Sequence, residues 1–280
     1  MSEQRQVSET ARSTAFMRAL SCYEDDGNIK GHDHLAELFL PEERRAKLGS
    51  GAYREAAKQK IRAGTYEYLI ARTAYFDRFF LDCLQTDTPQ IVLLGAGYDT
   101  RAYRFGERAG GAKIFEADAP FTQDEKIETL NRNNIDHSRV RFVPVDFEKD
   151  SLSGALCAAG FDKAAKSAFI WEGVTLYLTE AAARGTLRHI AECSARGSLI
   201  GLDYLNFRPG AAANITRKDE AVLFGMGRAE MAEFMRGFGF AVTENLGSEE
   251  IADAFLKCED GQILGNIKST MNFLKAELCL

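Results

Sequence analysis

Several features that mark other classes of protein are missing from this sequence of 280 residues. No apolar run approaches the roughly 18 residues that span a bilayer, and the polar N-terminal segment has no apolar h-region. The six cysteines include no C-x-x-C pair, the spacing typical of zinc knuckles and redox dithiols. The net charge of -6 lacks the excess of lysine and arginine that a nucleic-acid backbone attracts. We therefore expect a cytoplasmic protein with free thiols, and neither a membrane nor a nucleic acid as partner.

Histidine is also scarce, with four residues in the chain, none of them in the motifs described below. His32 and His34 stand close together, but no further metal ligands accompany them. We interpret this pair as an ordinary loop or helix start, and we predict no metal site.

The sequence does contain enough apolar material for one sizeable core, with 45% hydrophobic residues. Apolar residues recur at helical spacing from residue 8 to residue 85, and short apolar runs then alternate with helix-like stretches. This alternation predicts an α/β fold with a largely parallel sheet covered on both faces. The predicted strands are Ile91–Leu94, Lys113–Asp118, Val140–Asp146, Ser167–Gly173, Ser198–Leu205, Phe240–Leu246 and a weaker one at Asn272–Leu280.

The pattern divides the chain into an N-terminal helical cap, residues 1–85, and a core, residues 86–280. A long connection at residues 206–226 interrupts the alternation, and connections of this length are usually functional or mobile. We expect a lid at about residues 206–236, with Phe224 and Met226 facing a ligand. The helical spacing of Met231, Phe234 and Met235 predicts that these three residues belong to the core.

The most informative motif is a glycine-rich turn, G-A-G-Y-D-T, directly after the first predicted strand. Gly95 and Gly97 leave room for a tight turn and for a ligand to approach the backbone amides. Glu116 and Asp118 end the next strand, 21 and 23 residues after Gly95, where an acid can accept both hydroxyls of a ribose. A plain turn and a solvated strand end are the alternatives for these two features.

A nicotinamide dinucleotide and an adenosyl sulfonium both suit this geometry, so other features must separate them. The turn lacks the third small residue that lets a helix pack under a pyrophosphate, and the chain has no Tyr-x-x-x-Lys pair. Asp146, followed by Phe147, can accept a hydrogen bond from the exocyclic amine of adenine. Glu172 ends the next strand, where it can bind an ammonium group or form a structural ion pair. Together these features favour an adenosyl sulfonium.

Four segments carry a family resemblance: VLLGAGYDTRAYRF, FEADAP, VPVDF and WEGVTLYLT. In this order and spacing they resemble the leucine carboxyl methyltransferase family, and more closely its bacterial branch of S-adenosylmethionine-dependent O-methyltransferases. The resemblance extends upstream to ETARSTAFMRAL and IARTAYFDRFF and covers the chain to about Gly239. It implies an α/β class I methyltransferase (Rossmann-like) fold with a seven-stranded, mostly parallel sheet. It also implies S-adenosyl-L-methionine as cofactor and S-adenosyl-L-homocysteine as product.

By the same resemblance, Tyr177 is the catalytic residue close to the site of methyl transfer. Arg72 would meet the methionine carboxylate, where two parallel hydrogen bonds fix the orientation. The alternative for Arg72 is a helix-surface ion pair, and the alternative for Tyr177 is a position in the core. The other implied cofactor contacts are Gly95 and Gly97 at the methionine portion, Asp118 at the ribose, Asp146 and Phe147 at adenine, and Glu172 at the amino group.

The methyl acceptor is open. Phosphatase-methylating members of the family carry a cysteine-lysine motif in the N-terminal helices that is missing here, where AFMRAL offers Arg18; this argues against a protein C-terminus. A small molecule with a carboxylate is favoured, because its pKa of about 4 leaves it ionised, whereas a phenol at about 10 needs a base. A hydroxyl acceptor, a protein carboxyl methyltransferase, a non-catalytic cofactor-binding module and a nicotinamide enzyme are the alternatives, and the oligomeric state is not indicated.

Overall fold

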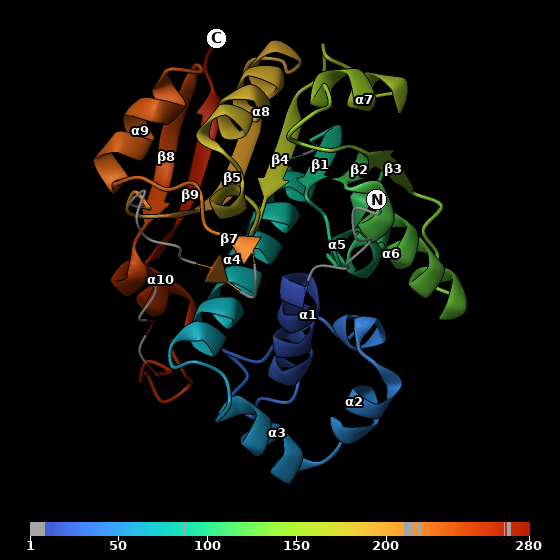
Figure 1. The fold of residues 1–280 in the computed structure, drawn as a ribbon, viewed down its shortest axis with the longest axis vertical. Helices are drawn as coiled ribbons and strands as arrows, with labels where there is room; N and C mark the ends of the chain where they lie inside the picture. Colours follow the sequence, from blue (N-terminus) through green and yellow to red (C-terminus); the bar gives the residue numbers. More distant parts are fainter. Residues whose placement is uncertain (1–8, 87, 210–215, 218–219, 266, 268–269) are drawn as a thin grey trace.

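The computed structural model describes the chain except for residues 1–8, 87, 210–215, 218–219, 266 and 268–269. At its centre is a seven-stranded sheet in the order β3-β2-β1-β4-β5-β9-β8 (Figure 1). Strands β1 to β5 run parallel, and β9 is antiparallel to both β5 and β8. The predicted class I methyltransferase fold is confirmed. The strands are β1 (Gln90–Leu94), β2 (Lys113–Asp118), β3 (Val140–Pro144), β4 (Ser167–Trp171), β5 (Leu199–Leu205), β8 (Phe240–Leu246) and β9 (Met271–Leu278).

Strand β1 shows why an unbroken apolar run forms the centre of this sheet. All of its residues are buried, with Ile91 and Leu93 in one hydrophobic cluster and Val92 and Leu94 in another. Successive side chains of a strand point to opposite faces, so the two clusters lie on opposite sides of the sheet. Both faces of β1 are therefore buried from solvent, as expected for parallel strands that helices cover on each side.

Helices complete both layers around the sheet (Figure 1). The cluster on one face includes Phe76 and Phe80, whereas the cluster on the other includes Leu187 and Met231. None of the helices in the described part of the chain has the length and apolarity needed to cross a bilayer. The helices of the sheet region are α5 (Arg101–Arg104), α6 (Pro120–Arg132), α7 (Leu152–Ala158), α8 (Glu180–Glu192), α9 (Arg228–Arg236) and α10 (Ser248–Phe255).

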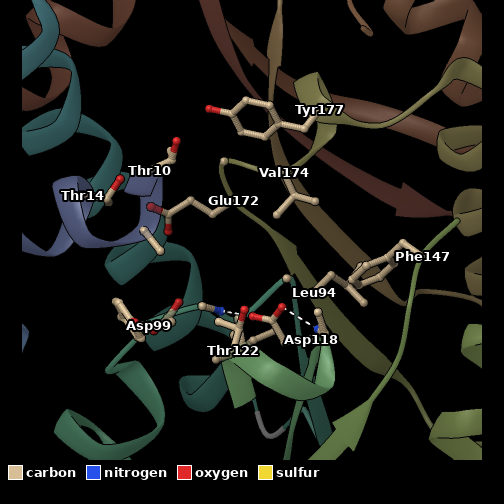
Figure 2. A pocket seen from close by; sticks show the side chains of 18 of the residues that line it. Thr10, Thr14, Leu94, Asp99, Asp118, Thr122, Phe147, Glu172, Val174 and Tyr177 are labelled. Atoms are coloured by element: carbon tan, nitrogen blue, oxygen red, sulfur yellow. Dashed lines mark hydrogen bonds between the residues drawn. The ribbon is translucent and has the colours of Figure 1, made fainter. Parts of the chain in front are cut away.

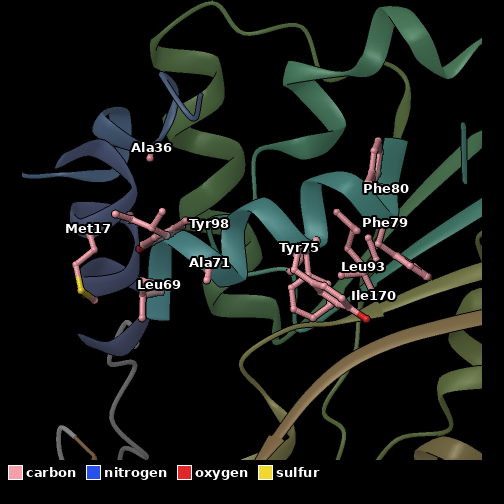
Figure 3. Packing of buried hydrophobic residues seen from close by; sticks show 14 of the residues in the cluster. Met17, Ala36, Leu69, Ala71, Tyr75, Phe79, Phe80, Leu93, Tyr98 and Ile170 are labelled. Atoms are coloured by element: carbon pink, nitrogen blue, oxygen red, sulfur yellow. The ribbon is translucent and has the colours of Figure 1, made fainter. Parts of the chain in front are cut away.

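The N-terminal part of the chain is helical, as the apolar spacing predicts. Its helices are α1 (Glu9–Ser21), α2 (Glu42–Lys47), α3 (Gly51–Lys58) and the long α4 (Thr65–Gln85). In Figure 3, Phe79 and Phe80 of α4 lie beside Leu93 and Ile170 of the sheet, while Leu69 lies nearer α1. One helix thus packs on both the N-terminal helices and the sheet, and the division into cap and core stays a prediction.

The long connection after β5 differs from the expectation in two ways. Part of it, residues 210–215 and 218–219, lies outside the described residues. Two short strands, β6 (Thr216–Arg217) and β7 (Glu220–Ala221), pair antiparallel where a plain connection is expected. The predicted lid at about 206–236 therefore stays a prediction.

The expectation that Phe224 and Met226 face a ligand is wrong. Both belong to the hydrophobic cluster under α9, with 4% and 1% of their surface exposed. The Phe224 ring packs on Phe234 with 5.6 Å between centroids, and the Met226 backbone N–H donates to the Leu205 carbonyl at 3.0 Å. These contacts draw the segment against the end of β5. The core assignment of Met231, Phe234 and Met235 is confirmed, since all three are buried.

The strand order decides where a ligand can bind. β1 lies between β2 and β4, and the chain builds the sheet outward from it in both directions. Connections that leave the carboxyl ends of β1 and β4 therefore diverge and open a crevice beyond those ends. The glycine turn follows β1, Asp118 ends β2, and Glu172 follows β4 directly. The topology thus brings the predicted site residues to one edge of the sheet.

Candidate functional site

A cavity of about 500 Å³ opens at this edge of the sheet. Its walls come from the segments that follow β1, β2, β3 and β4, together with α1 and one side chain of α4. Figure 2 shows Asp118 and Phe147 on one side of the cavity and Thr10 and Thr14 on the other. Eight of the residues singled out from the sequence line it: Arg72, Gly95, Gly97, Asp118, Asp146, Phe147, Glu172 and Tyr177.

The turn after β1 needs its glycines for two reasons. Gly95 and Gly97 have φ angles of +64° and +42°, in the left-handed region that side chains disfavour. A Cβ atom at Gly95 would also lie 2.3 Å from Cγ2 of Val174, which is far inside van der Waals contact. The bare backbone of this turn therefore forms part of the cavity wall.

Asp118 is fixed by the turns on either side of it. Its carboxylate accepts hydrogen bonds from the backbone N–H groups of Gly97 and Ala119, the latter at 2.6 Å (Figure 2). Burial raises the pKa of Asp118, and these two backbone donors act against that rise. The carboxylate is thus held at the cavity wall with its orientation set by the main chain.

Asp146 and Phe147 follow the end of β3 and line the same cavity as Asp118. Asp146 Oδ1 accepts the backbone N–H of Glu148 at 3.0 Å, and Oδ2 lies 2.9 Å from Lys149 Nζ. The hydrogen bond from Lys149 lowers the pKa of Asp146. The segment after β3 thus contributes an aromatic residue and an acidic residue to the lining of the cavity.

Arg72 lies inside the protein, so its interpretation as a helix-surface ion pair is wrong. The residue is 6% exposed, and its Nε is 2.8 Å from Oε1 of Glu172. Its Nη1 is 3.5 Å from Oδ2 of Asp203, a buried acid of β5. Asp203 also accepts the Tyr68 hydroxyl and the Gly173 backbone N–H, each at 2.6 Å. These bonds fix the turn that carries Glu172.

Sequence reasoning missed the group that completes this network, the pair Asp99 and Arg101. Arg101 is 0% exposed, and its guanidinium lies 2.5 Å from Asp99, 2.7 Å from Glu172 and 2.8 Å from Asp77. Burial acts to raise the pKa of Asp99, but Arg101 outweighs it and holds the pKa at about 2. The sequence does show two charged residues directly after a buried strand and a glycine turn. It does not show their role, because Asp77 and Glu172, which pair with Arg101, lie far away in the sequence.

Tyr177 closes the short 3-10 turn η3 (Thr175–Tyr177) after β4. Its side chain is half-buried, lines the cavity and also packs against a hydrophobic core cluster. Figure 2 shows the hydroxyl end of the ring on the α1 side, toward Thr10. The wall formed by Thr10, Thr14 and Arg18 of α1 is the second feature that the sequence did not reveal.

Glu116, the other candidate for the ribose, lies away from the cavity. Its Oε2 is 2.6 Å from Lys126 Nζ, and both side chains are 1% exposed. Burial raises the pKa of Glu116 to about 7, although Lys126 acts against this rise. Because strand residues alternate between faces, Glu116 and Asp118 point to the same face, but only Asp118 reaches the strand end. Glu116 is therefore a structural acid under α6.

Comparison with known proteins agrees with this geometry. The model of the leucine carboxyl methyltransferase family matches residues 11–191. A protein of Mycobacteroides abscessus, assigned as an S-adenosyl-L-methionine-dependent methyltransferase, is 32% identical over 262 residues, covering 85% of this chain and 84% of that protein. A Streptomyces coelicolor protein with the same assignment is 33% identical over 206 residues, covering 69% and 67%. For a Mycobacterium avium relative, 38% identical, the aligned part spans 44% of its length.

Solved structures resemble the chain more distantly. A Burkholderia thailandensis 1,6-didemethyltoxoflavin-N1-methyltransferase, crystallised with 1,6-didemethyltoxoflavin and S-adenosylhomocysteine, has 13% identity and a TM-score of 0.48. The comparison covers 89% of this chain and 90% of that chain. Similarity at this level does not bear on the substrate of this chain.

Proposed function

The chain belongs to the leucine carboxyl methyltransferase family, and we propose that it methylates a carboxylate or hydroxyl oxygen of a small molecule. S-adenosylmethionine is its cofactor and methyl transfer is its activity. The proposal concerns the atom that receives the methyl group and the residues that bind the two ligands. The observation that supports it best is the common cavity lined by the residues predicted from the sequence.

The residues around the cavity suit S-adenosylmethionine. We assign Asp118 to the ribose hydroxyls, because its carboxylate is held at the wall by two backbone donors. Phe147 would face the adenine ring, with Asp146 near its exocyclic amine. The glycine turn would let the ligand approach the main chain, where a Cβ at Gly95 has no room. When bound, S-adenosylmethionine supplies an electrophilic methyl group on a sulfonium sulfur.

The paired charges suit the amino-acid end of the cofactor. We assign Glu172 and Asp99 to the ammonium group, and Arg72 to the carboxylate. Glu172 lies between Arg72 and Arg101, so its position is set before any ligand binds. Such preorganised charges avoid the cost of reorganising polar groups during the reaction. The role of these residues is therefore to fix one end of the cofactor so that its methyl group points to the acceptor.

The acceptor side favours an oxygen that arrives ionised. Among the described residues that line the cavity there is neither a histidine nor a lysine. Glu172 and Asp99 are occupied by Arg101, which leaves them poor general bases. A carboxylate needs no base, because it is already an anion near neutral pH. We therefore assign Tyr177 to orienting the acceptor, and the exclusion of water to the surrounding apolar wall.

A labelled-methyl screen tests this proposal. The protein is incubated with S-adenosylmethionine carrying a tritiated methyl group and with a panel of aromatic acids, fatty acids and peptides. We expect label in a small carboxylic acid, released as methanol by mild alkali because the product is an ester. Label found in peptides alone, or on nitrogen, would contradict the proposal.

The assigned ribose contact predicts the effect of Asp118→Ala. Loss of the carboxylate leaves polar groups unpaired, so the binding free energy of S-adenosylmethionine should weaken by about 1 to 3 kcal/mol. Isothermal titration calorimetry measures this, with thermal unfolding as a check on folding. Asp124→Ala, an exposed acid on the same α6 region, is the matched control and should leave affinity unchanged. Equal affinity of Asp118→Ala and the wild type would remove the assignment.

A further inference from the structure

One wall of the cavity has no part in the assigned cofactor contacts. Helix α1 supplies Thr10, Ala11, Thr14 and Arg18 to it. Figure 2 shows Thr10 and Thr14 across the cavity from Val174, with Asp118 and Phe147 at the other end. A cofactor bound along the tips of the strands leaves this wall to face the second reactant.

The spacing on α1 produces a polar stripe. Thr10, Thr14 and Arg18 are each four residues apart, so they lie above one another on one face of the helix. Ser13 of the same helix lines a different hollow, together with Phe16 and Tyr53. Ser13 therefore lies outside the methyl-transfer cavity, whereas the stripe lines it.

Thr10 has an unused hydrogen-bonding group. Its Oγ1 is shielded from water and has no hydrogen-bond partner among the residues that the structure describes. A buried hydroxyl without a partner costs free energy, and a ligand oxygen in the cavity would satisfy it. Tyr177 lies opposite, with its hydroxyl end toward the same space (Figure 2).

The charge of this wall suits an anion. Arg18 is 5% exposed, and its Nη2 donates to the Tyr98 carbonyl at 2.7 Å, which fixes the guanidinium in place. Its Nε is 3.4 Å from Asp33, an acid that also lies 3.5 Å from Arg104. Among the lining residues from α1, none is acidic. A carboxylate beside this wall meets hydroxyl donors and a nearby cation.

We propose that Thr10 and Thr14 are the positioning residues for the acceptor. Their hydroxyls donate to the carboxylate oxygen that is not methylated, which turns the other oxygen toward the methyl group. The new C–O bond forms as the C–S bond breaks, and the electron pair of that bond stays on sulfur. The ester product is neutral, so it loses the charge-assisted part of these hydrogen bonds and leaves. This inference rests on the proposed carboxylate acceptor.

The test uses Thr10→Val and Thr14→Val, which remove the hydroxyl and keep the shape. With the best carboxylic acid from the labelled-methyl panel, each variant should raise the acceptor KM about tenfold or more, the usual size of a lost hydrogen bond to a charged group. The Kd of S-adenosylmethionine should stay within about twofold of the wild-type value. Thr10→Ser and Thr14→Ser restore a hydroxyl and should recover most of the acceptor KM. Ser13→Ala, which removes a hydroxyl of α1 that lines a different hollow, is the matched control.

The possible outcomes are separable. An unchanged acceptor KM in both valine variants would overturn the inference, and so would serine variants that fail to rescue. A parallel rise in the Kd of S-adenosylmethionine would show that the wall holds the cofactor instead. If the wild-type protein labels no carboxylic acid, the proposed carboxylate acceptor fails, and this inference falls with it.

Discussion

Arg101→Met is expected to lower the free energy of unfolding by about 3 to 5 kcal/mol, the range for removing one partner of a buried ion pair. Arg101 is fully buried and holds Asp77, Asp99 and Glu172 together at distances of 2.8, 2.5 and 2.7 Å. Methionine fills much of the space but leaves three carboxylates close to one another without their common cation. Urea unfolding followed by circular dichroism measures the loss.

The pH dependence of this variant provides an independent check. In the wild type, Arg101 depresses the pKa of Asp99 from 3.8 to about 2, so this acid stabilises the fold above pH 4. That contribution is lost as the pH falls toward 2, because Asp99 then becomes protonated in the folded state as well. In Arg101→Met the depression disappears, so the variant should lose less stability than the wild type between pH 4 and pH 2.

Arg184→Met is the matched control. Arg184 pairs with Glu180 within α8 at 2.8 Å, but 47% of its side chain is exposed. Exposed pairs contribute about 0 to 1 kcal/mol, so this variant should unfold almost like the wild type. If Arg101→Met proved as stable as Arg184→Met, the buried network would not hold the site together.

Gly95→Ala is expected to reduce the affinity for S-adenosylmethionine more than a hundredfold, equivalent to about 3 kcal/mol. The new Cβ would lie 2.3 Å from Val174 Cγ2, and an L-residue at φ +64° adds strain. The turn must move to relieve the overlap, which displaces the main chain that faces the ligand. Calorimetric titration measures the affinity, and thermal unfolding should show an accompanying loss of stability.

Two further variants separate the causes of this loss. Val174→Ala removes the methyl group that Gly95→Ala would strike, so the double variant should regain part of the affinity but not the part lost to backbone strain. Gly185→Ala is the control: a Cβ there meets nothing within 4 Å, inside helix α8. That substitution should leave binding unchanged and slightly raise stability. Normal binding by Gly95→Ala would show that the turn is not part of the cofactor site.

The sequence predicted the sheet well because apolar runs report burial directly. The predicted bounds of β2 and β8 match the observed ones. β3 ends two residues earlier than expected, since its neighbour β2 stops at Asp118, the partner of Pro144. Asp146 then has no strand beside it to pair with. The end of a strand depends on its neighbour, which its own residues do not encode.

The site residues were predictable where they follow strands or glycines, because parallel strands collect their carboxyl ends at one edge. The contacts of Arg101 and the stripe of Thr10 and Thr14 could not be predicted, since they depend on how α1 and α4 pack on the sheet. For Phe224 the sequence predicted a contact with a ligand that the structure does not show. Its apolar ring is equally suited to contact a ligand or to pack in the core. Hydrogen bonds of the main chain around it hold the ring in the core.

A crystal structure with S-adenosylhomocysteine bound would test most directly whether the four strand ends form one cofactor site. We expect the ribose hydroxyls within about 3.2 Å of the Asp118 carboxylate, a normal hydrogen-bond distance. The adenine ring should lie beside Phe147, and the amino-acid end between Arg72 and Glu172. A ligand bound elsewhere, or one in this cavity that leaves Asp118 and Glu172 without contact, would contradict the assignment.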